Sequence, residues 1–159
     1  MGKTTDWTPD ELTVSELAYT AGIVDGEGSI GIRKRRNNRG VVYHVVTLEV
    51  SNTDPALIVW LHKRYGGTVN QHRQQMANSK VLFRWIVSAV KAGSILQVLL
   101  PYLVIKKAQA EVAILMRQAI CPLGTNRITQ DMRDKREALY RRMRHLNKRG
   151  VGQPVELVA

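Results

Sequence analysis

Asp25 and Glu27, the two acids of the stretch Asp25-Gly26-Glu27-Gly28, are the residues best suited to chemistry. Two carboxylates beside the free carbonyls of a helix end offer a set of oxygen ligands, which is what a hard divalent cation such as Mg²⁺ prefers. The plainer interpretation of such a stretch is a solvated turn. The residue types alone leave both interpretations open.

A helix must position these acids. Thr13 and Glu16 have the spacing of a capping box, which predicts that a helix begins there. Gly26 and Gly28 disfavour a helix, so we expect it to end after Asp25. The acids then lie at a helix C-terminus, where the helix dipole already contributes negative charge and would stabilise a bound cation.

One side of this helix has almost no side-chain bulk. Ala18, Gly22 and Gly26 recur every four residues, with Ala21 and Asp25 beside them. Such a stripe allows two helices to approach backbone to backbone, and two copies related by a two-fold axis would bring two acidic tips together. We therefore expect Ala18, Ala21, Gly22 and Asp25 at a dimer interface. A tight contact within one chain is the alternative.

Residues 20–28, Thr-Ala-Gly-Ile-Val-Asp-Gly-Glu-Gly, resemble the nine-residue motif of the LAGLIDADG homing endonucleases, with Thr for the first Leu and Glu for the last Asp. The resemblance extends over residues 13–120. It implies an intron-encoded, site-specific double-strand DNA endonuclease that uses Mg²⁺, with Mn²⁺ as a substitute and Ca²⁺ binding without supporting cleavage. The single copy of the motif implies a homodimer acting on a long pseudo-palindromic duplex site.

The resemblance also implies roles for individual residues. Glu27 and the Gly26 carbonyl would hold the metal, and Asp25 would bond to backbone N–H groups of the second motif helix. Asn52 stands where these enzymes carry a polar residue that positions water, and Lys106 matches a lysine of their active site. From spacing alone, Lys106 is an ordinary first-turn residue of a helix. Residues 55–56 are Pro-Ala where relatives often have a basic residue, so the water-activating network is altered.

Composition restricts the possible partners. The chain has 159 residues, 44% of them hydrophobic, and a net charge of +11, which favours a globular domain with a polyanionic partner. The single cysteine, Cys121, excludes intrachain disulfides and a cysteine-based zinc site. The most apolar run, residues 95–105, is too short to span a bilayer, so we expect a soluble intracellular protein.

The order of elements predicts an α+β fold with an α-ββ-α-ββ-α core and C-terminal helices. We expect hairpins over residues 29–50 and 68–87, and helices over 55–65, 89–100, 106–119 and 130–148. The strands would form a four-stranded antiparallel sheet with helices on one face. By this interpretation residues 1–12 are an arm, 13–120 the endonuclease core, and 121–159 a basic helix and tail.

The open face of that sheet would carry mostly polar and basic side chains. Arg, Asn and Gln on a twisted ribbon can read base edges in the major groove, although an ordinary solvated face is the alternative. The expected DNA-binding residues are Arg33, Arg35, Asn37, Tyr43, Thr47, Glu49, Asn70, His72, Gln74 and Arg84. The basic C-terminal helix is either solvated or in contact with flanking phosphates.

Two other functions fit the same scaffold: an RNA-binding intron maturase, and a DNA-binding regulator that lacks the metal site. Glu27 with both neighbouring glycines argues against the regulator, which has no use for paired acids at a helix tip. No splicing residues flank the domain, which favours a free-standing protein over part of an intein.

Overall fold

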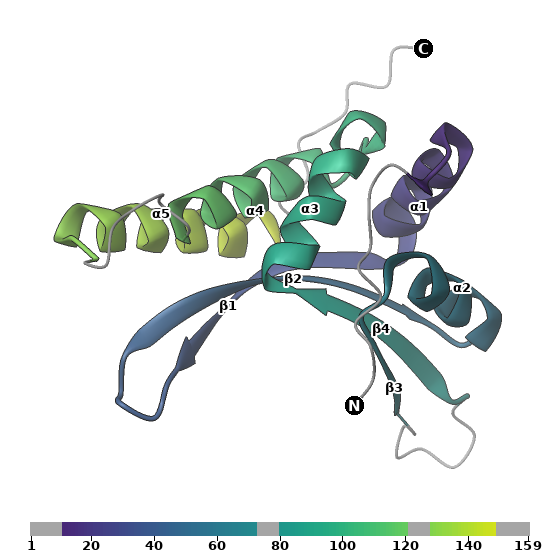
Figure 1. Cartoon of the computed structure of the whole chain (residues 1–159), viewed down its shortest axis with the longest axis horizontal. Coiled ribbons are helices and arrows are strands. Elements are labelled where there is room, and N and C mark those ends of the chain that lie inside the picture. Colours follow the sequence, from purple (N-terminus) through teal and green to yellow (C-terminus); the bar gives the residue numbers. More distant parts are fainter. Residues whose placement is uncertain (1–10, 73–79, 121–127, 149–159) are drawn as a thin grey trace.

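One antiparallel sheet with helices on a single face forms this α+β protein (Figure 1). The computed structural model describes residues 11–72, 80–120 and 128–148. The strands are β1 (Gly28–Arg36), β2 (Val42–Asn52), β3 (Thr68–His72) and β4 (Leu82–Ser88), in the order β1-β2-β4-β3. The helices are α1 (Val14–Glu27), α2 (Pro55–Tyr65), α3 (Ala89–Leu99), the 3₁₀ turn η2 (Leu100–Tyr102), α4 (Lys107–Ile120) and α5 (Gln130–Leu146). The predicted α-ββ-α-ββ-α order and the antiparallel sheet are confirmed.

Alternation along the strands separates the core from an open face. On β2, Val46, Leu48 and Val50 are fully buried beneath the helices together with Trp85 of β4. The intervening side chains point to the face that no helix covers. Figure 1 shows that this face is concave, because both hairpins bend away from the helices. The predicted assignment of the two faces is therefore correct.

The end of α1 differs from the expectation. The helix continues through Gly26 to Glu27, and Gly28 is its C-cap, in an extended conformation. A Cβ atom at Gly28 would lie only 2.6 Å from the Val24 carbonyl oxygen, so the chain can pass directly from α1 into β1 only with glycine there. A helix tolerates Gly26 at a modest cost, and the strict requirement for glycine falls two residues later.

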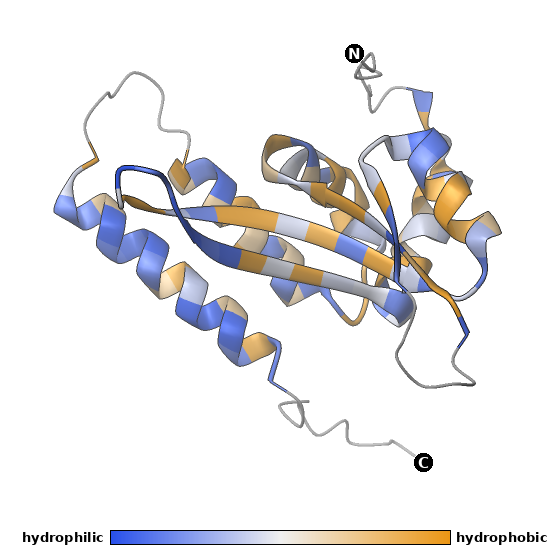
Figure 2. Ribbon diagram, turned by 90° about the horizontal axis from the view of Figure 1, so that it is seen from below, coloured by the Kyte–Doolittle hydropathy of each residue, from blue (hydrophilic) through white to orange (hydrophobic). Residues whose placement is uncertain are grey.

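Helix α5 lies beside the outer edge of β1, as Figure 2 shows from below. Its buried Arg136 donates two hydrogen bonds, at 3.1 and 2.9 Å, to the carbonyl of Ala119 near the end of α4. Asn147 donates at 2.9 Å to the Ile30 carbonyl of β1, which occupies part of that strand's free edge. Among the described helices, α5 included, none has the length and apolar character needed to cross a membrane.

Candidate functional site

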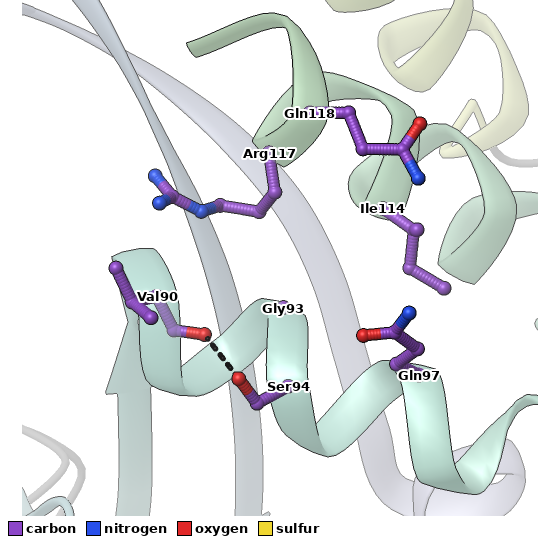
Figure 3. A pocket seen from close by; sticks show the side chains of 7 residues that line it. All are labelled: Val90, Gly93, Ser94, Gln97, Ile114, Arg117 and Gln118. Atoms are coloured by element: carbon purple, nitrogen blue, oxygen red, sulfur yellow. Dashed lines mark hydrogen bonds between the residues drawn. The ribbon is translucent and has the colours of Figure 1, made fainter. Parts of the chain in front are cut away.

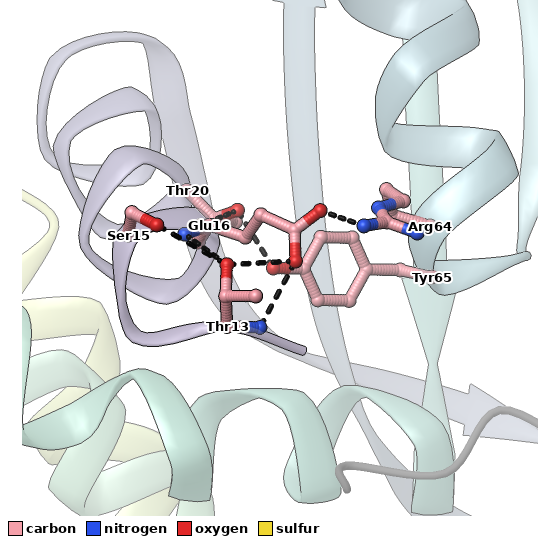
Figure 4. Close-up of polar contacts among 6 residues, drawn as sticks. All are labelled: Thr13, Ser15, Glu16, Thr20, Arg64 and Tyr65. Carbon is pink, nitrogen blue, oxygen red and sulfur yellow. Dashed lines mark hydrogen bonds and ion pairs between the residues drawn. The ribbon is translucent and has the colours of Figure 1, made fainter. Parts of the chain in front are cut away.

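A polar network joins the first half of α1 to the end of α2 (Figure 4). Thr13 and Glu16 form the predicted capping box, and Glu16 also pairs with Arg64. The hydroxyl of Thr20, the first motif residue, donates at 2.7 Å to the Glu16 carbonyl and lies 2.7 Å from the Tyr65 hydroxyl. Burial raises the pKa of Tyr65, so its hydroxyl stays neutral. The contacts of Glu16 and Thr20 with α2, which the sequence did not predict, fix one side of α1.

The opposite side of α1 is bare. Ala18, Gly22 and Gly26 are exposed, and a Cβ atom at either glycine would meet no other atom within 4 Å. Tyr19 on the same helix is 56% exposed. Ala21, however, is fully buried in the core of its own chain, so its expected place at a dimer interface is wrong. Ala21 lies about a quarter turn from Gly22, and that rotation separates the core side from the stripe.

Asp25 ties the tip of α1 to the segment before α4. One carboxylate oxygen accepts from the Val104 N–H at 2.8 Å, and the other accepts from the Lys106 N–H at 2.9 Å. The Lys106 ammonium in turn donates to the Asp25 carbonyl. Both carboxylate oxygens thus accept from their own chain, where the sequence suggested bonds to a second motif helix. A cation at this position also complements the negative end of the α1 dipole.

Glu27 is the last residue of α1 and is exposed. The carbonyls of this last turn, including that of Gly26, have no N–H partner within the helix. The structure therefore brings the Glu27 carboxylate, the Gly26 carbonyl and the half-buried Lys106 to one end of one helix. These are hard oxygen ligands beside a fixed positive charge.

Asn52 approaches the same end through strand register. Val50 pairs with Gly28, so Asn52 at the end of β2 lies beside the α1–β1 junction. Its side-chain oxygen accepts from the Asp54 N–H at 2.8 Å, which shapes the turn into α2. No other described residue forms a hydrogen bond with the amide nitrogen of Asn52.

On the open face, an acid and two arginines form a row across three strands. Glu49 of β2 is paired with Arg33 of β1, and its other carboxylate oxygen lies 4.0 Å from Arg84 of β4. Arg84 also donates to the Ser51 hydroxyl at 3.3 Å. The Glu49 side chain is only 14% exposed whereas that of Arg33 is 46% exposed, so the carboxylate lies closer to the sheet and the guanidinium closer to solvent. The arginine is presented outward in a restrained orientation.

The other predicted DNA-binding residues are distributed over the same face and its hairpin turn. Thr47 faces the open side opposite Gly31 but is only 6% exposed, which corrects the expectation that it reaches DNA. The side-chain oxygen of Asn37 accepts from Arg39 and Val41, so this residue closes the β1–β2 turn. Gln74 lies outside the described residues. Exposed on the open face are Arg35, Tyr43, Asn70 and His72.

A separate pocket of about 290 Å³ lies between α3 and α4 (Figure 3). Arg117 of α4 crosses Gly93 of α3, where a Cβ atom would lie 2.7 Å from the arginine Cγ. None of the residues predicted to act on DNA lines this pocket. Within the described residues there is no group of three or more His, Cys, Asp or Glu side chains that could hold a metal on its own.

Comparison with known proteins depends on structure, because no family model and no curated protein matches the sequence. The archaeal intron-encoded homing endonuclease I-Vdi141I, solved with DNA, superposes with a TM-score of 0.69 over 86% of each chain, at 14% identity. The chain has the LAGLIDADG homing endonuclease fold. The resemblance seen in residues 20–28 is thereby confirmed at the level of the fold.

Two further LAGLIDADG structures differ in length. I-CvuI, solved with its target in the presence of Ca²⁺, has a TM-score of 0.55 and 20% identity over 79% of this chain and 94% of its own. The meganuclease I-SmaMI, bound to DNA, has a TM-score of 0.64 and 16% identity over 85% of this chain. The match covers only 47% of I-SmaMI, so this chain spans about half of that protein's length.

Proposed function

We propose that the protein is a site-specific double-strand DNA endonuclease that acts as a homodimer with a divalent metal ion. The observation that carries the proposal is the exposed Glu27 at the end of a helix whose outer side is bare. The structures of similar fold support this proposal, since I-Vdi141I, I-CvuI and I-SmaMI were all solved with DNA. The net charge of +11 supports the same partner.

Two observations support the dimer: the bare stripe on α1 and the length of this chain relative to I-SmaMI. Ala18, Gly22 and Gly26 expose backbone that an equivalent helix can approach closely, and the resulting contact would be symmetric about a two-fold axis. I-SmaMI is about twice as long as the matching part of this chain, so two copies would supply a comparable assembly. Each copy would present one Glu27 to one DNA strand.

The oxygen ligands at the tip fit a metal such as Mg²⁺. This ion usually takes one or two protein carboxylates and completes its octahedron with water and substrate phosphates. Glu27 and the Gly26 carbonyl would hold it. When bound, the metal would neutralise phosphate charge and lower the pKa of coordinated water.

The remaining groups have roles that do not depend on the metal. Lys106, bonded to the Asp25 carbonyl, would stabilise negative charge that develops on a phosphate. The side-chain amide nitrogen of Asn52 would orient a water molecule at the scissile bond. Arg33, Arg35 and their neighbours on the open face would read the target in the major groove.

The first test compares the wild type with Glu27→Gln. We expect the wild type to cut both strands of its site with Mg²⁺, and the variant to bind that site with similar affinity but not cut it. Glu111→Gln, an exposed glutamate of α4, is the matched control and should cut normally. A wild type that binds a specific duplex without cutting it would refute the endonuclease and support a DNA-binding regulator.

The second test addresses the dimer. Position 22 is exposed and a Cβ atom there meets nothing in its own chain, so Gly22→Leu should fold and even stabilise the monomer, because glycine is a poor helix former. It should nonetheless block close approach of two α1 helices. We expect a dimer for the wild type and for the control Ala138→Leu, and a monomer for Gly22→Leu, by sedimentation. A wild type that stays monomeric on its DNA contradicts this part.

A further inference from the structure

A basic groove lies between β1 and the C-terminal half of α5, on the opposite side of β1 from Arg33. Its volume is about 560 Å³, and four of its lining residues are cationic. Lys34 comes from β1, Arg141 and Arg144 come from α5, and Lys148 follows that helix. The spacing of the two arginines with Glu137, at i, i+4 and i+7, puts all three on one helix side.

The charge of the groove is strongly unbalanced. Its single carboxylate, Glu137, is 2.6 Å from the Lys34 ammonium and 3.3 Å from the Arg141 guanidinium. The hydrogen bond from Lys34 lowers the pKa of Glu137, which therefore stays ionised at neutral pH. Among the described residues, no ion pair or side-chain hydrogen bond engages Arg144 or Lys148. Two exposed cations are thus left for a partner from outside.

The position of the groove connects it to the open face. Lys34 lies between Arg33 and Arg35 in sequence, and the alternation of the strand sends its side chain to the other face. The Asn147–Ile30 hydrogen bond holds α5 along the β1 edge. Seen from below in Figure 2, α5 lies outside the outline of the sheet, next to β1. Helix α5 therefore lies beside the sheet at the β1 edge of the concave face.

We propose that this groove binds the phosphate backbone of duplex DNA that flanks the part of the target lying on the open face. The inference rests on the proposed function. Lysine and arginine without competing acids suit phosphate oxygens, and such contacts add affinity without reading sequence. Of the two ring side chains that line the groove, Tyr140 is half-buried with the Lys34 ammonium 4.5 Å from its ring centre, and only His145 is exposed.

Two double variants with the same change of charge test the groove. Arg144→Gln/Lys148→Gln removes its two unpaired cations. Lys135→Gln/Arg142→Gln removes two exposed cations from the other side of the same helix. Affinity for duplex DNA is measured without metal over a range of salt concentrations, so that cleavage does not enter.

We expect the groove variant to bind about tenfold more weakly at low salt, with a slope of log affinity against log salt that is reduced by about one to two. The loss should be equal for target and scrambled duplexes and should vanish on a duplex trimmed to the base-contacted part. The control variant should bind like the wild type. Equal losses in both variants, or an unchanged slope in the groove variant, would overturn the proposal.

Other outcomes separate this inference from the proposed function. If the variant loses affinity for single-stranded RNA and keeps its affinity for duplex DNA, the groove binds RNA and the proposal is wrong. If the wild type never cleaves DNA, the endonuclease fails, yet the salt slopes on scrambled duplexes still decide the groove. Glu137→Gln gives an independent check, since it frees Lys34 and Arg141 and should tighten duplex binding several-fold.

Discussion

Replacing Asp25 with asparagine tests how the tip of α1 is held. The Val104 and Lys106 N–H groups donate to the two Asp25 carboxylate oxygens at 2.8 and 2.9 Å. The change removes the charge and one of these two acceptors, so the asparagine NH₂ group would face one of the two N–H donors. A hydrogen bond to a charged group contributes about 1.5–3 kcal/mol, and the remaining bond also becomes weaker. We expect the free energy of unfolding to fall by about 2–4 kcal/mol, or roughly 4–15 °C in Tm for a domain of this size.

Urea unfolding followed by circular dichroism measures this loss. Asp54→Asn is the matched control, because Asp54 caps α2 by accepting from Ala56 and asparagine is an equally good cap. We expect the control to change stability by less than about 0.5 kcal/mol. A similarly small effect for Asp25→Asn would refute the reasoning. A loss seen only at protein concentrations where the chain is dimeric would instead assign the bonds of Asp25 to a second copy. Cleavage by Asp25→Asn should fall while DNA binding is kept, because the Lys106 segment shifts.

Three further predictions concern other parts of the fold. Burial, with help from the Lys34 ammonium, lowers the pKa of His44 below 6.5. The folded protein therefore binds fewer protons than the unfolded chain, and its stability falls as pH drops below about 6.5. The His44→Phe variant should lose less stability between pH 7.5 and 5.5, measured by urea titration. Ala89 has a φ of 54°, a backbone conformation that disfavours any residue but glycine. Ala89→Gly should therefore raise the free energy of unfolding by about 0.5–1 kcal/mol, whereas the control Ala138→Gly should lower the free energy of unfolding. Glu49→Gln should relax base preference at the position contacted by Arg33 by about 1–3 kcal/mol, measured by selection from a DNA library.

Local sequence signals were sufficient for the fold. The Thr13–Glu16 capping box is present, and the predicted open-face residues Tyr43 and Glu49 of β2 lie on the side opposite its buried Val46, Leu48 and Val50. These features depend on neighbours in the chain, so no knowledge of distant contacts is needed. The prediction was wrong where a small residue can lie either in the core or at an interface. Ala21 and Gly22 look equivalent in the sequence, yet Ala21 is fully buried and Gly22 is exposed.

Long-range partners of the site could not be predicted. Asp25 bonds to Lys106, 81 residues later, and Thr20 to Tyr65, 45 residues later. No periodicity or capping rule specifies such pairs, because they depend on how α1 packs against α2 and η2. The low exposure of Thr47 likewise depends on how β2 pairs with β1 on one side and β4 on the other.

These contacts bear on whether residues 25–28 form a solvated turn or a site. In a solvated turn, the Asp25 carboxylate would bond to its own neighbouring backbone or to water. Here it bonds to a segment about eighty residues away, and Gly28 packs so closely on Val24 that no side chain fits. Glu27 is therefore exposed but attached to a backbone fixed on both sides. A carboxylate whose backbone is already fixed loses less entropy when a ligand arrives than one on a solvated turn, and this difference is the reason we propose a binding site here.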